Sequence, residues 1–259
     1  MPRLVRDNVY LGYEDAGRGD PPLMFVHGVA CHRGFWAPQL GRFAQAHRVV
    51  AVDLRGHGES DAPHEPYTMQ VFAGDVAWMS GRLGVRRPVV VGHSLGGLVA
   101  LELAARYPEC ASAVVIIDSV LLPSAHRPEI VHELVASLRG PAPAAALRAY
   151  FETFFSPHDD ARRKSWILEA AVKTAPHVTS SIWEQSIGWN DAEALQRCRV
   201  PLLYIDAGTP NADLVRAGEL RPEMMVGQTV GSGHFSQLEV PDQVNAMLAR
   251  FLEITVPPG

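Results

Sequence analysis

The stretch that decides the fold is VVVGHSLGGLVA, residues 89–100. Three valines lead into Gly-x-Ser-x-Gly, formed by Gly92, Ser94 and Gly96, and an Ala/Leu-rich helical pattern begins at once. This order predicts a strand, a sharp turn and a helix, with Ser94 in a strained backbone conformation on the turn. The two glycines leave room for neighbouring backbone to approach closely. The Ser94 hydroxyl is therefore expected to project above the carboxyl end of a sheet.

Short apolar runs alternate with helical patterns on both sides of this stretch. Such alternation predicts the α/β class, with a mostly parallel central sheet and helices on both faces. In such a sheet, the loops at the carboxyl ends of the strands usually carry the binding and catalytic residues. Further strands are expected within residues 5–13 and at 23–26, 47–53, 113–117, 200–205 and 224–230, and helices at 67–83, 97–106 and from 241 onward.

The rhythm changes between residues 120 and 199, where strand-like runs vanish and prolines and glycines separate several helical segments. An insertion of this kind between two sheet strands is interpreted as a helical lid over the site. The expected organisation is an α/β core formed by residues 1–119 and 200–259, with the lid at 120–199. The lid helices are expected at 129–138, 144–155, 160–173 and 178–189.

Composition narrows the class of protein. The 259 residues are 47% hydrophobic and 20% charged, with a formal net charge of −5 and a pI near 6.1. Without a basic run, nucleic acid is not an expected partner. No segment approaches the roughly 18 apolar residues of a membrane span, and no secretory leader is visible, so a cytoplasmic protein without membrane attachment is expected. Three scattered cysteines, Cys31, Cys110 and Cys198, are expected to be free thiols.

Two loops that follow early strands carry polar residues. The His-Gly loop at 27–30 can turn its amides towards the top of the sheet, which makes the Val29 N–H a candidate oxyanion donor. The Leu95 amide, directly after Ser94, is the other candidate. His27 is interpreted as a structural brace, and Asp53 with Arg55 as an ion pair or a set of turn-fixing hydrogen bonds.

Four motifs together resemble the α/β-hydrolase fold superfamily: His-Gly at 27–28, DLRGHGES at 53–60, GHSLGG at 92–97 and GHF at 233–235. The resemblance is to lid-bearing esterase-like, C–C hydrolase and haloperoxidase-like members. It implies Ser94 as nucleophile and His234 as general base. A serine hydroxyl needs such a base because it is a weak nucleophile at neutral pH. Histidine, which titrates near the working pH, suits that task.

The resemblance leaves the acid of the triad open. In most members the acid lies a few residues beyond the strand that corresponds to 201–205, but the aligned position here is Pro210. Asp206 is close to the strand end and Asp213 lies slightly too far along. Asp118, directly after the preceding strand, matches an alternative position that some relatives use. Asp118 is the preferred candidate, with Asp213 and Asp206 as alternatives.

The function expected from these residues is hydrolysis of a small, apolar ester through an acyl-enzyme on Ser94. No cofactor or metal is expected, the partner is a small-molecule substrate, and a homo-oligomer stays open. Alternatives on the same scaffold are a cofactor-free dioxygenase, a C–C bond hydrolase or a perhydrolase, and, outside catalysis, a ligand receptor. Dehalogenation through an aspartyl nucleophile is disfavoured because Ser94 occupies the turn.

Overall fold

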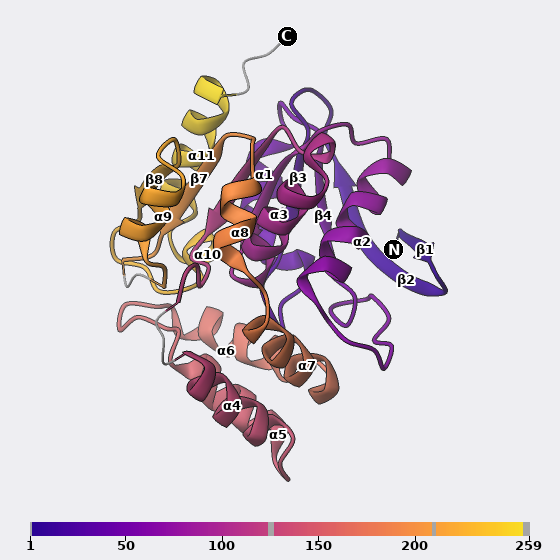
Figure 1. Cartoon of the computed structure of the whole chain (residues 1–259), viewed down its shortest axis with the longest axis vertical. Helices are drawn as coiled ribbons and strands as arrows, with labels where there is room; N and C mark the ends of the chain where they lie inside the picture. Colours follow the sequence, from indigo (N-terminus) through magenta and orange to yellow (C-terminus); the bar gives the residue numbers. More distant parts are fainter. Residues whose placement is uncertain (1, 124–126, 209–210, 256–259) are drawn as a thin grey trace.

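A single eight-stranded sheet organises the chain (Figure 1), in the order β1-β2-β4-β3-β5-β6-β7-β8. The computed structural model describes residues 2–123, 127–208 and 211–255. Every strand expected from the sequence is present. The strands are Arg3–Arg6 (β1), Val9–Ala16 (β2), Leu23–Val26 (β3), Val49–Val52 (β4), Val89–His93 (β5), Ala113–Ile117 (β6), Leu202–Asp206 (β7) and Met225–Gln228 (β8).

The sheet is mostly parallel, as predicted. Only the pairs β1–β2 and β2–β4 are antiparallel, whereas the pairs from β4 through β8 are parallel. The carboxyl ends of β3 to β8 therefore meet at one edge of the sheet. β5 lies between β3 and β6, so the turn after β5 is flanked by the loops that follow both neighbours.

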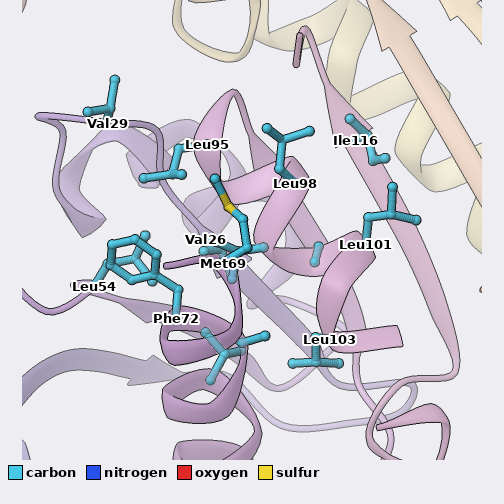
Figure 2. Packing of buried hydrophobic residues seen from close by; sticks show 14 of the residues in the cluster. Val26, Val29, Leu54, Met69, Phe72, Leu95, Leu98, Leu101, Leu103 and Ile116 are labelled. Atoms are coloured by element: carbon cyan, nitrogen blue, oxygen red, sulfur yellow. The ribbon is translucent and has the colours of Figure 1, made fainter. Parts of the chain in front are cut away.

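Alternate residues of the buried strands face two separate cores. Met24 and Val26 of β3 belong to one cluster, and Leu23 and Phe25 to the other, because successive side chains of a strand point to opposite faces. The first cluster packs against α2 and α3; Figure 2 shows part of it, including Phe72 on α2. The second packs against α1 and α11. These helices span Ala37–Phe43 (α1), Met69–Arg82 (α2), Leu95–Arg106 (α3) and Pro241–Thr255 (α11).

The described residues between β6 and β7 form five helices, where the sequence predicted a helical segment. Four of them gather at the lower end of the view in Figure 1, with α4 in contact with α5 and α7, and α5 in contact with α6. The fifth, α8, was not expected and packs instead on α3, beside the sheet. They span Arg127–Leu138 (α4), Pro143–Glu152 (α5), Ala161–Ala171 (α6), Pro176–Ile187 (α7) and Asp191–Arg197 (α8).

The remaining helical segments are short. Two follow strands at the carboxyl edge, η2 connects α3 to the start of β6, and α9 connects β7 to β8. None of the helices in the described ranges is both long and apolar enough to pass through a membrane. The short segments are Arg33–Trp36 (η1), Pro108–Cys110 (η2), Leu214–Leu220 (α9) and Ser236–Glu239 (α10).

Two glycines allow β5 to reverse into α3 within one residue. A Cβ atom at Gly92 would lie 2.0 Å from the carbonyl oxygen of Gly96, and a Cβ at Gly96 would lie 2.0 Å from that of Val26. Both contacts are with backbone of the central strands or of α3, which cannot move aside cheaply. The absence of side chains at these positions is therefore a packing requirement.

We expect Gly96→Ala to be severely destabilising, by at least about 3 kcal/mol, because the new methyl group would overlap β3 backbone in a close-packed core. Gly81 is a matched control, since it lies in α2 and a Cβ there meets nothing within 4 Å. Gly81→Ala should be neutral or stabilising by up to about 1 kcal/mol. Urea unfolding of both variants measures this; equal stabilities would contradict it.

Candidate active site

Ser94 lies between β5 and α3 in a strained conformation, with φ 51° and ψ −119°. Its N–H donates to the carbonyl of Ile117 (2.9 Å). Its own carbonyl accepts a hydrogen bond from the Ser119 hydroxyl (2.6 Å). The residue is half-buried. These bonds fix the turn against the end of β6 and the loop that follows it. The strained conformation of Ser94 is retained because the surrounding structure holds it in place.

His234 and Asp118 meet at the carboxyl edge of the sheet, 116 positions apart in the sequence. The His234 Nδ1 lies 2.6 Å from Asp118 Oδ2, and both residues are buried. Because a carboxylate only accepts hydrogen bonds, Nδ1 carries the proton and Nε2 is left as the basic nitrogen. Asn211 donates from Nδ2 to the same Asp118 oxygen (2.8 Å).

The backbone of His234 is held from two sides. Its N–H donates to the carbonyl of Phe154, which follows α5 (3.0 Å). Its carbonyl lies 2.8 Å from Nε2 of His93, which donates to it. Sequence reasoning placed no role on His93 or Asn211. The position of His93 beside the nucleophile was the only sequence signal for either residue.

Ser94 and His234 are brought to the same edge without a direct hydrogen bond between their side chains in the part of the chain that the structure describes. The His234 ring lies beside that of His93, the neighbour of Ser94, with centroids 4.6 Å apart and the ring planes tilted by 50°. In a site without substrate, catalytic hydrogen bonds are often long and shorten only when the substrate is bound.

The two candidate oxyanion donors belong to residues close to Ser94. Leu95 is the first residue of α3, where the N–H has no helical acceptor. Val29 lies in the loop after β3, and a Cβ at the preceding Gly28 would lie 3.1 Å from the Ser94 Cβ. The carbonyl of Val29 accepts from the Cys31 thiol (3.3 Å). Figure 2 shows Val29 on its loop and Leu95 on the opening turn of α3.

The alternative acids have other partners. Asp206 Oδ2 accepts from the Gln228 amide (3.0 Å), and burial together with the charge of Asp118 raises the pKa of the Asp206 carboxyl. Asp213 caps α9 through the Arg216 N–H (3.0 Å). Pro210, the aligned position, lies outside the described residues. Of the three candidate acids, only Asp118 forms a hydrogen bond with His234 in the described residues.

The loops expected to be scaffold are confirmed as such, with one correction. Nε2 of His27 accepts from the Leu54 N–H (3.0 Å) and Nδ1 donates to the Gly28 carbonyl (2.7 Å), so this ring braces two loops. The predicted ion pair of Asp53 with Arg55 is wrong, whereas the alternative of turn-fixing hydrogen bonds holds for Asp53, which accepts from the Glu59 N–H (3.0 Å). Asp53 pairs with Arg33 of η1, and Arg55 reaches the other way, to Asp75 on α2 (2.8 Å). Both carboxylates are fully buried, and each forms an ion pair with the guanidinium that the packing places beside it.

A cleft of about 630 Å³ opens beside the loop after β3. Cys31 and His32 form one wall and Trp166 and Ala170 of α6 another, with Ser60 among the residues between them; Ser94 and His234 do not line it. No three His, Cys, Asp or Glu side chains converge as a metal site in the ranges described. All three cysteines are free thiols.

The chain is similar in sequence to known hydrolases. The family model for the α/β-hydrolase fold matches residues 21–241, and the chain belongs to that family. It is 25% identical over 97% of its length to 2-(acetamidomethylene)succinate hydrolase of Mesorhizobium japonicum, covering 94% of that protein.

Solved structures of two further hydrolases superpose on almost the whole chain. The enol-lactonase of Burkholderia xenovorans has a TM-score of 0.86 at 24% identity, over 97% of this chain and 100% of that one. A thermophilic esterase of Thermogutta terrifontis has a TM-score of 0.86 at 22% identity, over 98% of both chains. At these identities the likeness shows the fold.

Acidification should destabilise the fold through its buried histidines. Burial lowers the pKa of His27, His57 and His93, that of His57 to about 4. The unfolded state, with histidine pKa near 6.5, then binds more protons below that pH, and stability falls from pH 7 towards pH 4. For His57 alone the loss at pH 5 is on the order of 2 kcal/mol.

Urea unfolding of wild type at pH 7 and pH 5 measures this loss. His57→Gln should flatten the dependence, whereas the exposed control His158→Gln should keep the wild-type slope. The prediction is contradicted if wild type is equally stable at both pH values.

Proposed function

We propose that this protein is a serine hydrolase that cleaves small, apolar carboxylic esters through an acyl-enzyme. Ser94 is the nucleophile, His234 the general base and Asp118 the acid, with the amides of Val29 and Leu95 as the oxyanion hole. The observation that carries the proposal is the 2.6 Å hydrogen bond from His234 to Asp118 beside the strained turn of Ser94. The matching family and its hydrolase relatives support it.

Each group has a defined task in the proposed cycle. Nε2 of His234 takes the Ser94 proton as Oγ attacks the ester carbonyl, and returns it to the departing alcohol. The carbonyl oxygen, now negative, accepts hydrogen bonds from the two amides; losing one such donor typically costs about 10²–10³ in kcat. Asp118 keeps the proton on Nδ1 and stabilises the imidazolium. A water activated by His234 then releases the acid.

Aromatic rings near the base favour an apolar substrate group. The Phe154 ring lies 4.5 Å from that of His234, centroid to centroid. The Phe35 and Trp166 rings stack 4.6 Å apart where η1 meets α6. Phe154 follows α5, and Trp166 lies on α6. Helices α4–α7 are proposed to form a lid. The substrate is proposed to be a small molecule, since sites for such ligands are lined predominantly by apolar and aromatic side chains.

A second group of reactions shares the same base and acid. A cofactor-free dioxygenase, a C–C bond hydrolase or a perhydrolase would also use a His234–Asp118 pair. An acid after β6 favours the dioxygenase among them. Oxygen uptake with an aromatic hydroxy-ketone, in the absence of ester hydrolysis, would favour the dioxygenase.

Ser94→Ala should lower kcat on p-nitrophenyl acetate by at least about 10³-fold, because the acyl-enzyme cannot form. Ser165→Ala is the control, since Ser165 is an exposed serine on α6, and should retain wild-type rates. Mass spectrometry of the quenched wild-type enzyme should find the acetyl group on the peptide that contains Ser94. Wild-type turnover by Ser94→Ala would rule out the proposed nucleophile.

Three acid variants distinguish the candidate acids on a panel of p-nitrophenyl esters of increasing acyl length. Asp118→Asn should lower kcat by roughly 10⁴-fold, because the imidazole loses the group that fixes its tautomer. Asp206→Asn and Asp213→Asn should stay within a few fold of wild type, as their side chains bond Gln228 and the start of α9. An inactive Asp213→Asn beside an active Asp118→Asn would refute the assignment.

A further inference from the structure

The carboxylate of Asp118 is bonded asymmetrically. Oδ2 receives both hydrogen bonds, from Nδ1 of His234 (2.6 Å) and from Nδ2 of Asn211 (2.8 Å). Oδ1 is buried and has no hydrogen-bond partner in the described part of the chain. A buried carboxylate oxygen without a donor is costly. The side chain therefore keeps this orientation only because both donors are directed at the other oxygen.

The backbone at Asp118 gives further reason for an external anchor. Asp118 has φ 44°, in the left-handed region, directly after β6. Its N–H donates to the carbonyl of Ile205 on β7 (2.9 Å), which fixes the main chain but leaves the carboxylate free to rotate about its last bond. Asn211 comes from the loop after β7, the strand that pairs with β6. It reaches Asp118 because parallel neighbours end at the same edge.

We propose that Asn211 is a positioning residue of the His234–Asp118 pair. Its amide holds Oδ2 in the place where the imidazole Nδ1–H is received, so it acts on catalysis through Asp118 and touches no reacting atom. This inference rests on the proposed function. It adds that the loop after β7 supplies a donor to an acid carried by β6.

A double-mutant cycle tests this role, using kcat and KM for p-nitrophenyl acetate. Asn211→Ala should lower kcat by about 10-fold with KM within two-fold, as expected for loss of one hydrogen bond to a charged group in the transition state. In an Asp118→Asn background the same change should cost less than two-fold, because residues that act as a unit are non-additive. A merely structural role would give equal losses in both backgrounds.

Two isosteric changes test the donor itself. Asn211→Asp keeps the shape but replaces the donor with a second carboxylate, and should lose at least as much kcat as Asn211→Ala. Combining Asn211→Asp with Asp118→Asn should give no recovery over Asp118→Asn alone, because Oδ2 receives both bonds, and an amide at position 118 cannot offer an acceptor to His234 Nδ1–H and a donor to the new carboxylate from that one atom. Asn190→Ala is the control, because Asn190 also makes a side-chain hydrogen bond but caps α8, and it should keep wild-type kcat.

The outcomes separate this inference from the proposed function. Melting temperatures of all variants identify losses that come from unfolding, and only folded variants enter the cycle. If Ser94→Ala hydrolyses the ester as wild type does, the proposed function is wrong and this inference falls with it. If Ser94→Ala and Asp118→Asn are inactive while folded Asn211→Ala keeps wild-type kcat, or loses as much in both backgrounds, only the role of Asn211 is wrong.

Discussion

The structure depends on one steric constraint, the reversal of β5 into α3 over the single residue Ser94. The reversal requires glycine, a residue without a Cβ atom, at one position of β5 and two positions of α3. Gly92 and Gly96 pack against main-chain atoms of α3 and β3, and a Cβ at Gly97 would lie 2.2 Å from the Ser119 hydroxyl. That hydroxyl donates to the Ser94 carbonyl. The constraint on the turn therefore extends to the loop after β6, where the next residue back is Asp118.

Buried polar groups at the carboxyl edge position the loops around that turn. A buried charge is tolerated only when it is paired and hydrogen-bonded, and Asp53 accepts from the Arg33 N–H (2.7 Å) and the Glu59 N–H (3.0 Å) as well as from the Arg33 side chain. His27 likewise has a partner at each ring nitrogen. These groups link the loop that carries Val29 to the loop after β4 through hydrogen bonds. They hold the backbone near Ser94 in place although none of these bonds is made to Ser94 itself.

The sequence predicted the sheet well because its central strands are buried on both faces and read as unbroken apolar runs, as at residues 113–117. It did not predict α1 or α9, which are seven residues each. Helices this short have little stability of their own and form through tertiary contacts. The ion-pair partner of Asp53 could not be predicted from the sequence either. Neighbouring Arg55 and distant Arg33 carry the same guanidinium group, and only the packing of the fold selects Arg33.

The position of the base shows what sequence motifs leave out. The sequence shows a glycine before His234 but not why glycine is needed there. A Cβ at Gly233 would lie 2.6 Å from the carbonyl oxygen of Phe154, which accepts the His234 N–H. The carbonyl of His234 is held by His93, on the strand that carries the nucleophile. The imidazole is thus fixed between the core and the segment after α5. Any movement of that segment would break a backbone hydrogen bond of the base, which couples the geometry of the site to the helices between β6 and β7.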